Sequence, residues 1–95
     1  MKNKRKKVYV TFAVDFLHEG HIKILKTANK YGDVIVGLLT DEAIVKYKKL
    51  PNLDYKSREL LIKNIKYVTR VIPQYTDDYT ENLNLIKPDY LVHGD

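Results

Sequence analysis

The sequence of 95 residues contains no cysteine, which excludes a disulfide framework and leaves no thiolate for a metal site. A membrane-spanning helix needs about 20 apolar residues, and no apolar run of this chain is nearly that long. The first residues also show no hydrophobic core of a signal peptide. Internal repeats, low-complexity tracts and interdomain linkers are also missing. We therefore expect one cytoplasmic domain with a single hydrophobic core and no membrane partner.

The formal net charge of +5 comes from the first seven residues. Lys2, Lys4, Arg5, Lys6 and Lys7 carry five positive charges, and the rest of the chain holds 12 basic and 12 acidic residues. Such a leader can be a solvated segment, an arm that attracts anions or part of a nucleic-acid contact, and we favour the first. The sequence thus divides into a basic leader, 1–7, and a domain, 8–95, for which we expect no nucleic-acid partner.

The segment 15–21 is the most informative part of the chain. It sets His18 and His21 three residues apart around Gly20, directly after the apolar run 8–14. Helical periodicity follows, so the histidines lie where a strand passes into a helix. The unpaired N–H groups of a helix N-terminus attract anions, and a glycine lets a ligand approach the backbone closely. This pattern predicts a phosphate-binding site.

A zinc site is the first alternative for these histidines. Zinc helices place two histidines at i and i+4, as in H-E-x-x-H, whereas His18 and His21 stand at i and i+3. His93 is the only other histidine, so few ligands remain. Taken singly, each histidine is also explained as a solvated or packed side chain.

Strand and helix patterns alternate along the whole chain. Strands are expected over 8–14, 33–39, 68–73 and 90–93, and helices over 20–31, after the N-cap Thr40, after the N-cap Asp54 and at a capping box formed by Asp78 and Glu81. In the third helix, Leu61, Ile65 and Val68 should form the buried stripe. The tyrosines fit core or rim packing better than base stacking. The run 33–39 lacks alternating polarity, which is typical of strands buried on both faces of a parallel sheet.

This alternation predicts an α/β fold with a Rossmann-like, doubly wound parallel sheet. In the strand order 3-2-1-4, the first and fourth strands are neighbours at the topological switch point, where ligands bind outside the carboxyl ends of the strands. His18 and His21 follow the first strand, and Gly94 and Asp95 follow the fourth. We therefore expect these four residues to line one crevice.

The stretch His18-Glu19-Gly20-His21 resembles the H-x-G-H signature of nucleotidyltransferases, specifically the cytidylyltransferases. The similarity continues through 32–42, 55–58 and 88–95, and covers nearly all of the chain after residue 7. It is greatest to the cytidylyltransferase modules associated with phosphoenolpyruvate mutases in phosphonate pathways. Glycerol-3-phosphate cytidylyltransferases are a more distant likeness.

The resemblance implies transfer of CMP from CTP to a small phosphonate or phosphorylated alcohol, with release of pyrophosphate. His18 and His21 would then donate to the phosphate chain, while Lys46 and Arg58 would neutralise phosphates, although both cations are also explained as solvated side chains. Mg²⁺ would bind mainly through the nucleotide phosphates, with no metal site made by the protein. A homodimer stays open. The implied nucleotide-binding residues are Thr11, Phe12, Ala13, Asp15, Gly20, Gly94 and Asp95.

The sequence departs from this family in two places. Thr11 stands where many relatives have glycine, and a second signature close to R-T-x-G-I-S-T, which grips the triphosphate, would lie beyond Asp95. We expect the fold to be truncated before that signature, so that the chain folds but transfers CMP poorly by itself. The alternatives are a nucleotide-binding or assembly module without turnover, and an adenylyltransferase.

Overall fold

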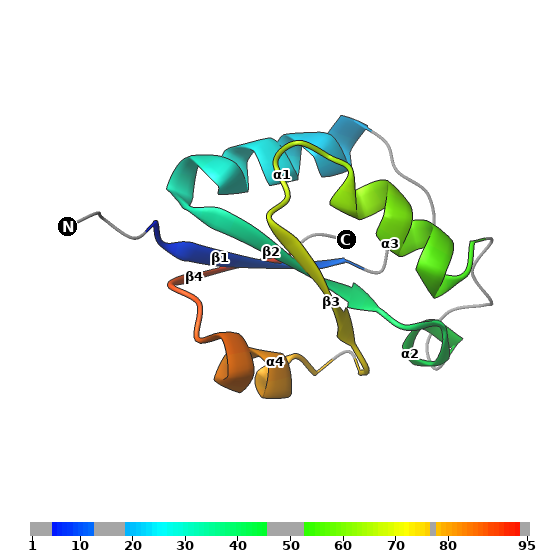
Figure 1. The fold of residues 1–95 in the computed structure, drawn as a ribbon. Coiled ribbons are helices and arrows are strands. Elements are labelled where there is room, and N and C mark those ends of the chain that lie inside the picture. The colour runs from blue at the N-terminus through cyan, green and yellow to red at the C-terminus, as the bar shows by residue number, and fades with distance from the viewer. Residues whose placement is uncertain (1–4, 13–18, 46–52, 77, 94–95) are drawn as a thin grey trace.

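The computed structural model describes residues 5–12, 19–45, 53–76 and 78–93. Within these ranges the elements are β1 (Lys7–Phe12), α1 (Glu19–Tyr31), β2 (Asp33–Leu39), α2 (Asp41–Val45), α3 (Tyr55–Lys63), β3 (Arg70–Gln74), α4 (Thr80–Ile86) and β4 (Tyr90–His93). All strand pairs are parallel, in the order β3-β2-β1-β4 (Figure 1). The predicted α/β class, Rossmann-like sheet and strand order are confirmed.

Helices cover both faces of the sheet, with α1 and α3 on one side and α4 on the other (Figure 1). The apolar strands explain this arrangement, because β1 and β2 are buried at nearly every position and need cover on each face. The larger core, on the α1 and α3 side, consists of Val8, Val10, Phe12, Leu25, Ala28, Val34, Val36, Leu38 and Ile62. The smaller one, under α4, consists of Tyr9, Ile35, Ile72 and Ile86. No helix of the described ranges has both the length and the apolarity to cross a membrane.

The predicted stripe of the third helix is wrong. Helix α3 ends at Lys63, and its buried residues are Arg58 and Ile62, whereas Leu61 is 47% exposed. Ile65 and Val68 pack against the core from a turn after the helix, in which the Val68 N–H donates to the Ile65 carbonyl. This turn also moves the start of the third strand from the predicted Val68 to Arg70.

The start of α4 differs from the prediction by one residue. Tyr79, and not Asp78, is the N-cap, and Glu81 is exposed. The Asp78 carboxylate still accepts hydrogen bonds from the Thr80 backbone N–H at 3.0 Å and the Thr80 hydroxyl at 2.6 Å. These bonds favour the charged form, so they lower the pKa of Asp78 below its ordinary value.

A polar network is buried under α4. The Tyr9 hydroxyl donates to Gln74 Oε1 at 2.7 Å and accepts from Asn82 Nδ2 at 2.8 Å. Asn82 also donates to the Pro73 carbonyl, and Gln74 to the Thr76 carbonyl. Burial raises the pKa of Tyr9, against a smaller lowering by the bond from Asn82. The network joins β1, β3 and α4 beneath the carboxyl ends of the strands.

Candidate functional site

The candidate site begins where β1 ends. Thr11 and Phe12, its last two residues, are buried between β2 and β4, with Thr11 in register with Gly37 on one side and His93 on the other. Neighbouring parallel strands thus bring residues 11 and 93 into register. The predicted adjacency of the first and fourth strands is confirmed, while the convergence of His18, Gly94 and Asp95 lies outside the described residues. The carboxyl ends of β1 and β4 are therefore adjacent.

The first turn of α1 lies against this strand end. His21 is the third residue of α1 and only 5% exposed. Its ring meets Phe12 edge to face, with centroids 5.2 Å apart and an angle of 77°. Gly20 precedes it in the same turn and is half-buried. The structure therefore joins Thr11, Phe12, Gly20 and His21, four of the residues predicted from the sequence, at one end of the sheet.

Apart from Arg58, the remaining predicted site residues lie outside the described ranges. They are Ala13, Asp15, His18, Lys46, Gly94 and Asp95. Their proposed roles stay predictions. Within the described ranges, no group of three or more histidine, aspartate or glutamate side chains is placed to hold a metal ion.

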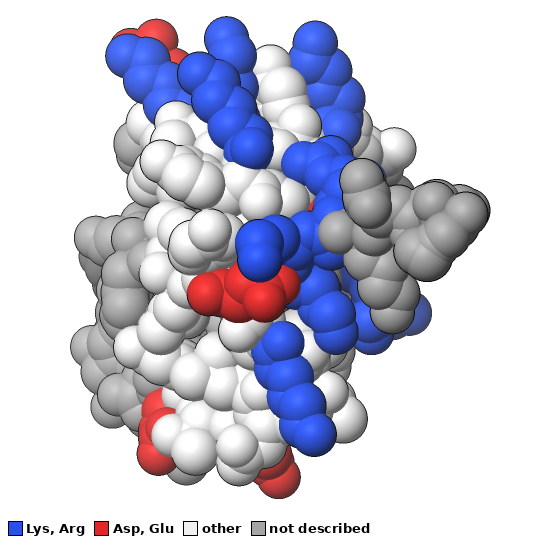
Figure 2. Space-filling view, turned by 90° about the vertical axis from the view of Figure 1, so that its left-hand side faces the viewer, with Lys and Arg blue, Asp and Glu red and all other residues white. Residues whose placement is uncertain are grey.

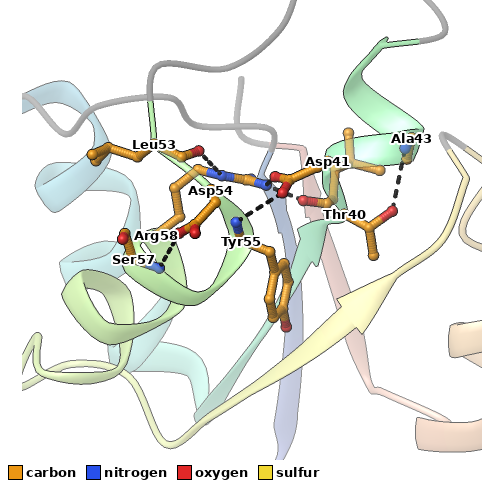
Figure 3. A network of polar contacts seen from close by, with 9 residues as sticks. Thr40, Asp41, Ala43, Leu53, Asp54, Tyr55, Ser57 and Arg58 are labelled. Atoms are coloured by element: carbon orange, nitrogen blue, oxygen red, sulfur yellow. Dashed lines mark hydrogen bonds and ion pairs between the residues drawn. The ribbon is translucent and has the colours of Figure 1, made fainter.

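Arg58 is not a surface residue, because its side chain is 1% exposed. Its Nε donates to the Leu53 carbonyl at 3.1 Å and its Nη1 to the Leu39 carbonyl at 2.8 Å. Its Nη2 forms an ion pair with Asp41 Oδ1 at 2.7 Å (Figure 3). The guanidinium therefore binds the end of β2, the start of α2 and the residue two places before α3. Neutralisation of substrate phosphates by Arg58 stays a prediction, and what the geometry supports is a positioning role.

Asp41 is a site-forming residue that the sequence analysis missed. Besides Arg58, its carboxylate accepts the Tyr55 backbone N–H through Oδ2 at 3.2 Å, so it helps to start α3 (Figure 3). Thr40 and Asp54 are the predicted N-caps, and both are confirmed. Thr40 Oγ1 accepts a hydrogen bond from the Ala43 N–H, and Asp54 Oδ1 accepts one from the Ser57 N–H. The only available signal for Asp41 was an acidic residue next to the predicted cap Thr40, two places after a buried strand.

Tyr55, the first residue of α3, carries a buried hydroxyl for which no hydrogen-bond partner is found among the described residues. Its ring packs against the larger core. Burial raises the pKa of Tyr55 to about 12, with a smaller contribution from Glu59. Below its ordinary pKa of 10.0 the phenol is neutral in both folded and unfolded chains. As the pH rises from 10 towards 12 the unfolded chain ionises first, so the folded state loses stability.

Tyr9 has a hydrogen-bonded buried hydroxyl and Tyr55 has one without a partner among the described residues, so the two tyrosines allow a matched test. We expect Tyr9→Phe to lower the free energy of unfolding by about 1–2 kcal/mol, because it removes the donor to Gln74 Oε1 and one of the two acceptors of Asn82. Tyr55→Phe should leave stability unchanged or raise it, because it removes an unpaired buried hydroxyl. It should also flatten the loss of stability between pH 10 and 12. Urea unfolding at pH 7 and along this alkaline series checks both results, and equal losses in the two variants would contradict them.

Known proteins resemble this chain over most of its length. The family model for cytidylyltransferase-like proteins matches residues 12–95. Ethanolamine-phosphate cytidylyltransferase of Arabidopsis thaliana is 33% identical over 100 residues, covering 99% of this chain and 24% of that protein. Glycerol-3-phosphate cytidylyltransferase of Bacillus subtilis is 40% identical over 70 residues, covering 73% and 54%. FAD synthase of Ferroglobus placidus is 33% identical over 89 residues, covering 94% and 59%.

The chain therefore spans 24% to 59% of the length of these three relatives. Among solved structures, the lipopolysaccharide core biosynthesis protein from Thermoplasma volcanium GSS1 matches with a TM-score of 0.84 and 33% identity, over 90% of this chain and 71% of that one. The names of these relatives include no phosphoenolpyruvate mutase, so that part of the resemblance stays a prediction. Because the family model matches everything from Phe12 onward, the chain belongs to the cytidylyltransferase-like family.

Proposed function

We propose that the chain carries the nucleotide-binding half of a cytidylyltransferase that moves CMP from CTP to a small phosphate-bearing alcohol or phosphonate. The observation that supports this most is the junction of β1, β4 and the first turn of α1. It sets the buried His21 imidazole and the N–H groups of a 13-residue helix at the switch point of the sheet. Such an arrangement suits a phosphate chain.

The proposed reaction is an in-line displacement at phosphorus. An oxygen of the acceptor phosphate or phosphonate forms a bond to the α-phosphorus of CTP, the bond from that phosphorus to the bridging oxygen breaks, and pyrophosphate leaves with the electron pair. Catalysis then consists mainly of aligning two anions and stabilising charge on the phosphoryl oxygens. His21 would donate a hydrogen bond to the phosphate chain, and His18 is proposed for the same task.

The Arg58 and Asp41 contacts support this proposal indirectly. They bind the end of β2 to the start of α3, and so hold both flanks of the segment that contains Lys46. A cation in that segment would need fixed flanks to reach a phosphate reproducibly. We propose that Lys46 is this cation.

Mg²⁺ would enter with the nucleotide. This ion keeps most of its waters and binds proteins through few carboxylates. The junction of β1 with α1 offers a threonine hydroxyl, an imidazole and backbone groups, which fits an ion held by the nucleotide phosphates. When bound, it would neutralise charge on the phosphates.

The proposal is tested by pyrophosphate release from CTP, measured in the longest polypeptide that contains this chain. The acceptors are glycerol 3-phosphate, ethanolamine phosphate and 2-aminoethylphosphonate, with EDTA as the metal-free control. Turnover with one of the phosphate esters supports the proposal, and turnover with the phosphonate alone would move the acceptor to that class. CTP binding without turnover for any acceptor would favour a nucleotide-binding module.

His21 provides the sharpest test of the site. We expect His21→Ala to lower kcat by about 10²–10³, the usual cost of losing one donor that stabilises transition-state charge. Because His21 packs on Phe12, the variant should also lose stability. Leu25→Ala, which removes a fully buried side chain one turn further along α1, is the matched control for that loss. Rates per folded molecule should fall only for His21→Ala, and equal rates in the two variants would remove His21 from the mechanism.

An adenylyltransferase is the second candidate, because a FAD synthase at 33% identity must attach an adenylyl group. Calorimetric titration with CTP, ATP and GTP in Mg²⁺ separates the two. We expect CTP to bind most tightly. Equal or tighter binding of ATP would replace the cytidylyl assignment with the adenylyl one.

A further inference from the structure

Within the described ranges, most acidic side chains lie at one end of the sheet and most basic side chains at the other. Acidic residues stand at the starts of helices, where they offset the positive end of the helix dipole: Glu19, Asp41, Glu42, Asp54, Asp78 and Glu81. Eight basic residues stand where helices end and strands begin, whereas Lys23 and Lys26 lie within α1 and Lys56 and Arg58 near the start of α3. The eight are Arg5, Lys6, Lys7, Lys30, Lys63, Lys66, Arg70 and Lys87. In a parallel α/β fold, the ends of helices and the starts of strands lie along the same edge of the sheet, at the amino ends of its strands. We call these eight residues the basic edge.

Figure 2 faces this edge and shows lysine and arginine side chains over most of its height, with few acidic ones among them. Asp33 and Asp89 are the acidic residues at the starts of strands in the described ranges. Both are engaged: Asp33 pairs with Arg5 at 3.5 Å, and Asp89 accepts the Lys7 backbone N–H at 2.8 Å. The edge therefore keeps a large positive excess.

Two of the eight cations donate hydrogen bonds to carbonyls at the ends of helices. Arg5 donates to the Asn29 carbonyl at the end of α1, and Lys7 Nζ donates to the Ile86 carbonyl at the end of α4. Among the described contacts, Lys6, Lys30, Arg70 and Lys87 have no ion pair, and Lys66 lies over the ring of Tyr67. Most of the positive charge thus points to solvent.

A hollow lies among residues of the basic edge, and a pair of exposed aromatic rings stands at the same end of the sheet. The hollow, of about 340 Å³, is lined by Arg5, Lys7, Asp33, Ile35, Thr69 and Arg70. Tyr31, at the end of α1, and Tyr90, at the start of β4, are 58% and 44% exposed. Their ring centroids are 5.5 Å apart. Cations that follow a phosphate backbone beside aromatic rings that stack on bases are the features of single-strand binding surfaces.

We propose that the basic edge binds single-stranded nucleic acid, with phosphates along Arg70, Lys66 and Lys87 and a base on the Tyr31 and Tyr90 rings. The expectation of no nucleic-acid partner rested on charge counted along the chain, where the domain is balanced, and on tyrosines that fit packing better than base stacking. Tyr31 and Tyr90 are instead exposed, at 58% and 44%. Folding separates those charges in space, and the basic edge lies opposite the nucleotide crevice. The two sites can therefore be occupied together.

The test is fluorescence anisotropy of a short labelled oligouridylate at increasing salt. Contact with three or four cations predicts a slope of log K against log salt of about −2 to −3. Arg70→Gln should weaken binding and reduce that slope by about 0.7, whereas Lys56→Gln, at the start of α3, should change neither. Tyr90→Leu should weaken binding about tenfold, whereas Tyr75→Leu, an exposed tyrosine just after β3, should not.

Saturating CTP with Mg²⁺ should leave oligouridylate bound. The proposal is overturned if the oligonucleotide does not bind at low salt, if CTP displaces it, or if the edge variants and their controls behave alike. Binding to phosphatidylglycerol vesicles that exceeds oligouridylate binding and survives Tyr90→Leu would also overturn it, in favour of a membrane surface. Thermal unfolding of each variant verifies that the fold is kept.

Discussion

Gly37→Ala is expected to unfold or severely destabilise this domain. A Cβ at Gly37 would lie 1.7 Å from Tyr9 Oη, 2.3 Å from Tyr9 Cζ and 2.8 Å from Gln74 Oε1. Tyr9 pairs with Ile35 across β1 and β2, and its ring extends diagonally over the next residue on the same face, Gly37. Neither ring nor amide can retreat, because Tyr9 is fully buried and hydrogen-bonded at its tip.

Overpacking in a core commonly costs about 1–3 kcal/mol, and a contact this short on a locked ring should cost at least roughly 3 kcal/mol. A small domain has a total stability on the order of 5–15 kcal/mol, so this loss is a large fraction. Urea unfolding of the four members of a Tyr9→Val and Gly37→Ala cycle isolates the clash. Gly37→Ala should cost far less when Tyr9 is already valine. The same cost in both backgrounds would show that the glycine is needed for another reason.

Loss of the Arg58 and Asp41 ion pair is the second large effect. Arg58→Met should lower the free energy of unfolding by about 3 kcal/mol, because it leaves the Leu39 and Leu53 carbonyls without their donor and Asp41 without its cation. We take the lower end of the range for broken buried pairs, since the Asp41 side chain is 37% exposed and solvent screens it.

Arg58→Lys distinguishes a positioning residue from a substrate ligand. A lysine ammonium keeps the charge but cannot reach three acceptors in the fork geometry of a guanidinium. If Arg58 holds β2, α2 and α3 together, Arg58→Lys should lose most of the free energy of unfolding that Arg58→Met loses, and its kcat should also fall. Asp41→Asn should have similar but smaller effects, because an amide accepts through one atom only, whereas Asp41 accepts through both oxygens. A raised KM for CTP or the acceptor with unchanged stability in Arg58→Lys would instead assign the arginine to phosphate binding.

The sequence predicted the parts of the fold that depend on local pattern. The apolar runs at 33–39 and 90–93 predicted the second and fourth strands at their observed bounds. Caps such as Thr40 and Asp54 also follow from a few neighbouring residues, because the hydrogen bond that they make spans three positions. The stripe failed at Leu61, because α3 buries the face of Arg58 and Ile62, and Ile65 and Val68 reach the core from a turn and not from the helix.

Four of the predicted site residues lie together in the structure, and their roles in binding and catalysis stay predictions. Thr11, Phe12, Gly20 and His21 lie at one end of the sheet because they end β1 and begin α1, the next helix in the chain, whose first turn packs on Phe12. The burial of Arg58 could not be predicted in the same way. An arginine is normally exposed, and only acceptors supplied by β2, by α2 and by the residues before α3 make its burial favourable.

By itself, then, the sequence determined the α/β class and the family, because hydrophobic periodicity and short motifs are properties of neighbouring residues. The tertiary structure decided which polar groups are paired and where charge accumulates. Tyr9 binds Gln74 across 65 positions, Arg58 binds Asp41 across 17, and Lys7 reaches the end of α4 across 79. Partners so far apart meet only once the crossovers are packed. The same packing turns a domain of balanced charge into one with a positive edge.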